Sequence, residues 1–361
     1  MEHSRQSGPP LCQAGRGLPA RHRVAGLPFR GAARLLHRLG RAPRSAGGAF
    51  VRAPQPRPAP VLGPRAARPG ATRRLSGNGG DYVVVPPASY VHALLRRSPR
   101  TALRQAAGFK AHGHWSLRAT ARMLLGGGSH SAWLTAAAGR IRERTAPGST
   151  PPTWGLRPFL PAWASAQAAD QLAELLRSAA EQSEPLAADP GRHAWMHQMR
   201  EGGRGAGLTK EATTADGLPT DSPFCDDAVL NACLAVRPEA ARTPWTYKPL
   251  LATAMDGLVP APLVGRTTKD HAGSDWFSGL KAHRRLLGEW TDTSHLVAAG
   301  IADESALRHA LLSPGLNIYG APALENTLST EAWLRDLAAH PVPAYLTPHD
   351  HREHPVDTTA H

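Results

Sequence analysis

The stretch LSGNGGDYVVVPPASY, Leu75 to Tyr90, divides the chain into two parts of different character. Upstream of it, arginine, proline and glycine follow one another without periodicity, whereas downstream apolar residues recur at helical spacing. Its SGNGGD run places three glycines beside an acid. Glycines let backbone N–H groups approach a phosphate and an Asp can hold the accompanying Mg²⁺, although such a run is more often only a turn. The stretch therefore raises a phosphate-binding hypothesis that other segments must support.

The excess positive charge of the chain lies in its first 74 residues. They hold 15 Arg, no Lys and one acid, whereas the remainder balances 27 basic against 27 acidic residues. Arg, Pro and Gly supply 36 of the 74, and such a composition buries too little apolar surface to offset the entropy of ordering. We therefore expect residues 1–74 to be disordered, apart from a short helix around Arg34–Arg38.

Three interpretations of residues 1–74 are open: a miscalled or frameshifted start, an Arg-rich arm for nucleic acid, or a targeting segment. We favour the first. The whole chain has 37 Arg against 5 Lys, which is typical of a GC-rich bacterial genome, and out-of-frame translation of GC-rich DNA yields Arg, Pro, Ala and Gly. A nucleic-acid partner is not expected, because the rest of the chain is neutral.

Cysteine usage and hydropathy indicate the compartment. Cys12, Cys225 and Cys233 form no CxxC pair and no even framework, which favours a reducing compartment. No apolar run approaches the ~18 residues of a membrane span, and there is no signal-peptide pattern. We expect a cytoplasmic protein without a membrane span.

Downstream of Tyr82 the pattern is mostly helical. The β-branched run DYVVV is predicted to close a strand or line the edge of a core, and Gly202 to Pro223 is predicted to be a loop. Tryptophans such as Trp245 and Trp290 are expected to anchor the core. Apolar spacing together with Ser, Asp or Pro start signals predicts helices over 90–95, 98–113, 116–125, 163–182, 226–236, 248–259, 274–290, 303–312 and 329–340.

Two further segments carry charges suited to a phosphate site. In PFCDD, Asp226 is placed to cap the following helix, which is the simpler interpretation of that acid. In GRTTKD, Arg266 and Lys269 lie in a loop between two helices. Cations in loops usually face water. The alternative interpretation is that these two residues contact a polyphosphate.

The order of the motifs is more specific than any single motif. LSGNGGD is followed by GLPTDSPFCDDAVLNACLAVRPE, then by YKPLLATAMDGLVPAPLVGRTTKD and a Trp-rich helical end. In this order the chain resembles the C-terminal part of an asparagine synthetase domain, and more closely the lasso-peptide macrolactam cyclases. The resemblance runs from about Leu75 to Leu346. It implies a mostly α fold, the C-terminal helical part of an α/β PP-loop (adenine nucleotide α-hydrolase-like) synthetase domain, spanning residues 75–346 with a flexible tail over 347–361.

The resemblance implies an ATP-dependent ligase that uses Mg²⁺. Such enzymes activate a carboxylate as an acyl-adenylate, release pyrophosphate, and form an amide when an amine attacks. The amine is ammonia in asparagine synthetases and the N-terminus of a precursor peptide in lasso cyclases. The implied partners are therefore a precursor peptide or amino-acid substrate, and a partner protease of a peptide-maturation system.

The resemblance also assigns site residues motif by motif. Asp81 matches the Mg²⁺–pyrophosphate ligand, Asn78 stands where the family usually has an acid, and Tyr82 stands where a Glu often follows. Asp226 matches the Asp of a Pro-Phe-Leu-Asp motif, in which Cys225 replaces Leu. The residues assigned to the second Gly-rich motif are Ser76, Gly77, Asn78, Gly79, Gly80 and Asp81.

Three cations complete the implied site. Lys269 matches the Lys that contacts phosphate during adenylation and is the candidate catalytic residue. Lys248 matches a basic residue at a helix start, whose role is left open. Arg266 is a second cation of the GRTTKD loop and a candidate contact of the nucleotide phosphates.

One departure from the family limits the expected activity. Its first pyrophosphate loop, Ser-Gly-Gly-x-Asp-Ser, has no match here, since SAGGAF at Ser45 lacks the Asp; nor is there a glutamine-amidotransferase-like domain. We therefore expect a truncated synthetase with little or no ligase activity. The alternatives are a non-catalytic helical module that binds a peptide or partner protein, and a nucleic-acid binder that uses the Arg-rich arm.

Overall fold

The structure, a computed structural model, describes residues 71–126, 128–143, 150–215, 217–265, 273–312 and 320–339. Residues 1–74 are predicted to be disordered, and residues 1–70 of this segment lie outside the described residues, as do the helix predicted near Arg34–Arg38 and the tail predicted over 347–361. The same holds for Arg266 and Lys269 of the GRTTKD loop.

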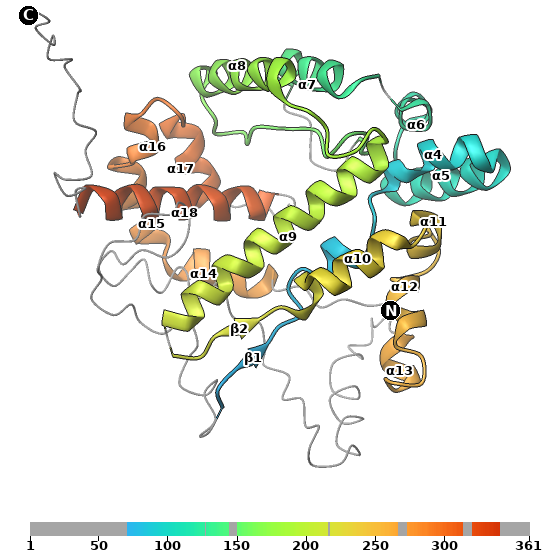
Figure 1. The fold of residues 1–361 in the computed structure, drawn as a ribbon. Coiled ribbons are helices and arrows are strands. Elements are labelled where there is room, and N and C mark those ends of the chain that lie inside the picture. Colours follow the sequence, from blue (N-terminus) through green and yellow to red (C-terminus); the bar gives the residue numbers. More distant parts are fainter. Residues whose placement is uncertain are drawn as a thin grey trace, which may run out of the picture.

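The described chain is mostly helical and holds one pair of short strands (Figure 1). The strands are β1 (Arg74–Leu75) and β2 (Thr220–Asp221), and two 3₁₀ turns are η3 (Ala88–Tyr90) and η4 (Pro223–Cys225). The helices are α3 (Gly80–Val84), α4 (Val91–Arg97), α5 (Pro99–Gly113), α6 (Leu117–Leu125), α7 (His130–Gly139), α8 (Ala166–Gln182), α9 (Pro190–Ala215), α10 (Asp227–Ala235), α11 (Pro238–Ala241), α12 (Pro249–Ala254), α13 (Ala261–Val264), α14 (Gly273–Ala282), α15 (Arg284–Asp292), α16 (His295–Ala298), α17 (Glu304–Leu312) and α18 (Gly320–Ala339).

The two strands bring the two predicted phosphate-site motifs to the same edge. β1 and β2 pair in parallel, with Arg74 opposite Thr220 and Leu75 opposite Asp221. The carboxyl ends of parallel strands face the same way, so the turns that follow them lie side by side. The first turn is the glycine loop that enters α3, and the second is η4, which leads into α10. β1 also crosses the boundary predicted between Arg74 and Leu75, so Arg74 belongs to the described fold.

The run DYVVV does not form the expected strand end, because most of it lies in α3. Val83 and Val84 are buried, in agreement with the predicted core edge. Helix α9 supplies partners to the carbonyls at the end of this short helix: Trp195 Nε1 donates to Val83 O at 3.0 Å and Gln198 Nε2 donates to Tyr82 O at 3.0 Å. Packing and side-chain capping from another helix thus override the β propensity of the valines.

The predicted loop from Gly202 to Pro223 is wrong over most of its length, because α9 continues to Ala215. Close packing explains the glycines at two points. A Cβ at Gly191 would lie 2.7 Å from Tyr90 Cα, and a Cβ at Gly202 would lie 3.0 Å from Tyr82 Cβ. The end of α9 is tied to β2 by Thr213 Oγ1, which accepts the Thr220 N–H at 2.9 Å. These contacts offset the intrinsic cost of glycine in a helix.

Four clusters of buried apolar residues hold the helices together. One joins α4, α5 and α6, one joins α3, α9 and α10, one joins α7 and α8, and one joins α14 to α18 with Trp163. In α8 the buried face is formed by alanines, Ala168 among them, while Leu175 is 67% exposed. Trp245 is not a core anchor: it is 54% exposed, with the guanidinium of Arg104 stacked 5.0 Å from its ring centre.

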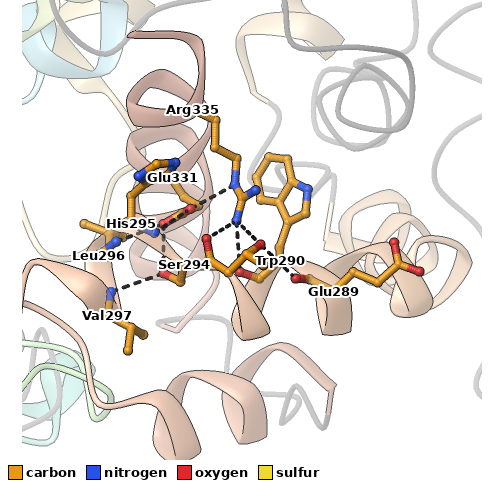
Figure 2. Close-up of polar contacts among 9 residues, drawn as sticks. Glu289, Trp290, Ser294, His295, Leu296, Val297, Glu331 and Arg335 are labelled. Carbon is orange, nitrogen blue, oxygen red and sulfur yellow. Dashed lines mark hydrogen bonds and ion pairs between the residues drawn. The ribbon is translucent and has the colours of Figure 1, made fainter. Parts of the chain in front are cut away.

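A buried carboxylate organises the C-terminal helices. Residues 329–331 do not start a helix as predicted, because they lie inside α18. Figure 2 shows Glu331 reaching from α18 to the start of α16. Its carboxylate accepts hydrogen bonds from Ser294 Oγ (2.8 Å), His295 N (3.0 Å), Leu296 N (3.1 Å) and Arg335 Nε (2.9 Å). Glu331 thereby satisfies the N–H groups that a helix start leaves open.

Candidate functional site

The glycine loop, residues Ser76 to Gly80, joins β1 to α3. The Asn78 N–H donates to Ser76 Oγ at 3.1 Å and the Gly80 N–H donates to Gly77 O at 3.2 Å, so the loop is a tight turn. Gly79 has φ +85°, a left-handed conformation that favours glycine. Among the described residues, no heavy atom beyond the chain neighbours of Gly77 lies within 4 Å of the position that a Cβ would take there, so no described residue packs against this part of the loop.

The glycine loop packs directly against the PFCDD motif. A Cβ added to Gly79 would overlap Cys225 Sγ, and one added to Gly80 would lie 3.1 Å from the ring of Phe224. Two of the loop's glycines are therefore required for packing between the motifs as well as for backbone conformation. The Cys225 side chain occupies the space that a Cβ at Gly79 would need.

An ion pair joins the glycine loop to a third segment. Lys248 Nζ pairs with Asp81 Oδ1, although the two residues are far apart in the sequence. The Asp81 side chain is 48% exposed and the Lys248 side chain 20% exposed. Lys248 precedes α12 with φ +45°, one of two non-glycine residues with positive φ in the described chain. A left-handed conformation is costly for a residue with a Cβ and is often found at functional positions.

Asp226 caps the N-terminus of helix α10. Its Oδ1 accepts the Ala228 N–H at 2.9 Å at the start of α10. This confirms the simpler interpretation of the acid in PFCDD. The cap orients η4, and with it the Cys225 side chain that lies against Gly79.

Of the three cations assigned to the site, the structure places Lys248 beside Asp81, while Arg266 and Lys269 lie outside the described residues. The sequence did not indicate the charges at the end of β2. There Asp221 accepts from Arg73 at 2.5 Å and pairs with Lys210 at 2.9 Å. The hydrogen bonds from Lys210 and Arg73 hold the pKa of Asp221 below its usual range. No local signal could have found this triad, since its members come from three separate elements.

Gln198 and Ser222 also escaped prediction. Gln198 lies in α9 and donates to carbonyls of the α3 segment, including Val85 O at 3.0 Å. The Oγ of Ser222 is buried in the turn after β2 without a hydrogen-bond partner among the described residues. A buried hydroxyl without a partner beside a glycine loop is a polar group that a ligand could satisfy.

The donor set fits Mg²⁺ shared with a polyphosphate better than a metal held by protein alone. Among the described residues no three His, Cys, Asp or Glu side chains gather closely enough to hold a metal ion. Mg²⁺ is usually held by one or two carboxylates together with substrate phosphates and waters. Asp81, which is half exposed, supplies such a carboxylate.

Comparison with known proteins identifies the class. The sequence model of the asparagine synthase family matches residues 48–335, so the match begins upstream of Leu75 and covers most of the chain. The chain therefore belongs to the asparagine synthase family, a family of ATP-dependent amide-forming synthetases. No curated protein and no solved structure matches the chain at a significant level. Within the described residues, no helix has both the length and the apolar character needed to cross a membrane.

Proposed function

We propose that the chain is an ATP-dependent synthetase that adenylates a carboxylate and passes the acyl group to an amine. The observation that carries this proposal is the convergence of three distant segments: SGNGGD packs against PFCDD, and Lys248 pairs with Asp81. In a member of the asparagine synthase family, these are the segments expected to meet the pyrophosphate.

Each residue has a distinct role in the proposed site. The Asp81 carboxylate would hold Mg²⁺, which when bound offsets the charge of the departing pyrophosphate. Lys248 and Lys269 would stabilise negative charge on the phosphates, and Arg266 would add a bidentate donor. Because Gly79 and Gly80 have no Cβ, the side chains of Cys225 and Phe224 can pack directly against the loop. Asn78, which stands where the family usually has an acid, cannot act as a base.

The substrate is proposed more narrowly from the order of motifs. We propose a lasso-peptide type of macrolactam closure, in which a side-chain carboxylate is adenylated, the N-terminal amine of a precursor peptide accepts the acyl group, and a protease works in the same maturation system. The protein would act in a bacterial cytoplasm. Because the sequence has no match to Ser-Gly-Gly-x-Asp-Ser, we propose that its ligase activity is weak.

The test is carboxylate-dependent exchange between ATP and pyrophosphate, measured with free amino acids and with peptides that carry Asp or Glu. We expect slow exchange that requires Mg²⁺ and is lost in Asp81→Asn. Exchange that is absent with every carboxylate, or that survives unchanged in Asp81→Asn, contradicts the proposal.

Lys269 supplies a sharper test of the same chemistry. Loss of one electrostatic donor to a transition state typically costs roughly 10²–10³ in rate. Lys269→Ala should therefore lower exchange by that order with an unchanged melting temperature, and Lys269→Arg should restore it only in part, because a planar fork does not reproduce a compact ammonium. Arg266→Ala is the comparison in the same loop and should lower exchange less than Lys269→Ala does. If Lys269→Ala keeps more than about a third of the activity, well outside that expected loss, the assignment passes to Arg266.

A further inference from the structure

The Asp81–Lys248 pair occupies the position where the proposed function needs a divalent cation. Lys248 Nζ sits on Asp81 Oδ1, the carboxylate that would hold Mg²⁺. The pair is half open to solvent on the acid's side, so a cation can reach Asp81. A metal ion and an ammonium group on one carboxylate repel each other, so tight binding of one requires the other to withdraw.

The ammonium group of Lys248 has a second partner in the same conformation. Its Nζ lies 5.2 Å from the centre of the Tyr247 ring, a distance at which an ammonium group is attracted to an aromatic face. The Tyr247 side chain is 44% exposed, so this face borders solvent. The backbone of Lys248 is held in the left-handed region at the start of α12, which fixes the root of the side chain near both partners.

From these contacts, and resting on the proposed function, we propose that Lys248 is a resident counter-ion of Asp81 and couples cation binding to polyphosphate binding. A divalent cation alone must displace the ammonium from Asp81. A polyphosphate that arrives with the cation gives the displaced ammonium a new anion. The two ligands therefore bind with positive cooperativity, and by linkage each strengthens the other by the same factor.

The molecule contains a matched control for this proposal. Lys210 also pairs with a carboxylate, that of Asp221 at 2.9 Å, and it is likewise an ammonium from another element. Asp221 is held in addition by Arg73 at 2.5 Å, so removal of Lys210 leaves it with a cation. Neither residue contacts Asp81 through a bond that the structure records.

The experiment measures Mn²⁺ binding to the full chain by electron paramagnetic resonance, without nucleotide. Lys248→Asn is the main variant, because Asn tolerates a left-handed conformation and removes the charge; Lys248→Met is the second, with a longer stem. Removal of the competing ammonium should tighten Mn²⁺ binding by about two- to fivefold, the scale of a partly exposed ion pair. Lys210→Met should bind as the wild type does, and Asp81→Asn should lose the site.

A second arm titrates inorganic pyrophosphate at buffered free Mn²⁺ concentrations. In the wild type, Mn²⁺ should strengthen pyrophosphate binding by about tenfold, a typical coupling, and in both Lys248 variants that enhancement should fall to about half or less. The proposal is overturned if Mn²⁺ affinity is unchanged or weaker in both Lys248 variants. It is also overturned if no protein shows Mn²⁺ binding that depends on Asp81. Coupled binding without ATP–pyrophosphate exchange would retain this inference while contradicting the proposed function.

Discussion

Two carboxylate–cation pairs in this molecule have similar chemistry and opposite surroundings. The Asp81 side chain, paired with Lys248, is 48% exposed, whereas that of Glu331, paired with Arg335, is 5% exposed. Glu331 also accepts from one hydroxyl and two backbone N–H groups, and Arg335 also donates to Thr293 O at 2.8 Å (Figure 2). The Glu331 pair is completed by protein donors and holds helices together, while the Asp81 pair keeps a carboxylate within reach of a ligand.

The comparison teaches that a cation beside an acid does not by itself define a site. Burial with several donors makes a pair expensive to break, because removal of one partner leaves the others unsatisfied. Exposure makes a pair cheap to break, because water replaces the lost partner. The following substitutions test this contrast, beginning with the largest expected effect on stability.

Glu331→Ala should lower the free energy of unfolding by about 3–5 kcal/mol, because it strands buried donors and leaves Arg335 without its carboxylate. Urea denaturation followed by circular dichroism measures the loss. Glu331→Gln keeps the shape and one acceptor oxygen and should cost less. A change below ~0.5 kcal/mol in Glu331→Ala, the range of ordinary surface substitutions, would show that the buried cluster does not hold the C-terminal helices.

Gly79→Ala should cost about 2–4 kcal/mol, since it combines a left-handed backbone with an overlap on Cys225 Sγ. The double variant Gly79→Ala, Cys225→Ala removes the overlap and should recover part of the loss. Gly77→Ala is the control in the same loop, because no atom of the described residues packs within 4 Å of its added Cβ. Thermal melts of the four proteins compare them, and equal melting temperatures for the Gly79 and Gly77 variants would contradict the packing argument.

A histidine cluster between α7 and α9 should make the fold sensitive to acid. Burial, and then the charges of His130 and His197, lower the pKa of His193 to about 4 from its usual 6.5. The His193 ring lies 4.8 Å from that of His130, and its Nδ1 accepts the Leu186 N–H at 2.9 Å. The folded state thus binds fewer protons than the unfolded chain between these two pKa values.

The sign of the effect follows from that difference in bound protons. Stability contributed by neutral His193 is complete above pH 6.5 and is lost as the pH falls towards 4, by roughly 3 kcal/mol in total. His193→Asn keeps an acceptor for Leu186 and should show a flatter loss. Urea midpoints measured at several pH values check this, and identical slopes for the wild type and the variant would refute it.

Asp81→Asn should have the smallest effect on stability, under about 1 kcal/mol, because its pair is partly exposed. The same substitution should abolish Mn²⁺ and pyrophosphate binding. Thermal melts of the wild type and the variant measure the change in stability, and equilibrium dialysis measures the binding of Mn²⁺ and pyrophosphate. A loss of stability as large as that of Glu331→Ala would remove the distinction between the two pairs.

Signals that act over a few residues were predictable from sequence. Ser116 and Ser165 cap α6 and α8 through their side chains, and Gly126 ends α6 with φ +83°. Pro99 begins α5 and Asp226 caps α10, as expected. Such signals lie within one turn of the residues they affect, so the chain alone contains them. The order of motifs likewise indicated the family that the comparison confirms.

Other features of the molecule depend on contacts between segments that are far apart in the sequence, and only the tertiary structure shows them. The sequence by itself determined the starts of several helices, such as α5, α6 and α10, the mostly helical fold and the family. The tertiary structure decided that α9 continues through its glycines, that DYVVV turns into a helix, and that Lys248 rests on Asp81 while Glu331 caps α16. Packing and polar satisfaction between elements outweigh the local propensities of a few residues, because a buried group without a partner costs more than a propensity gains.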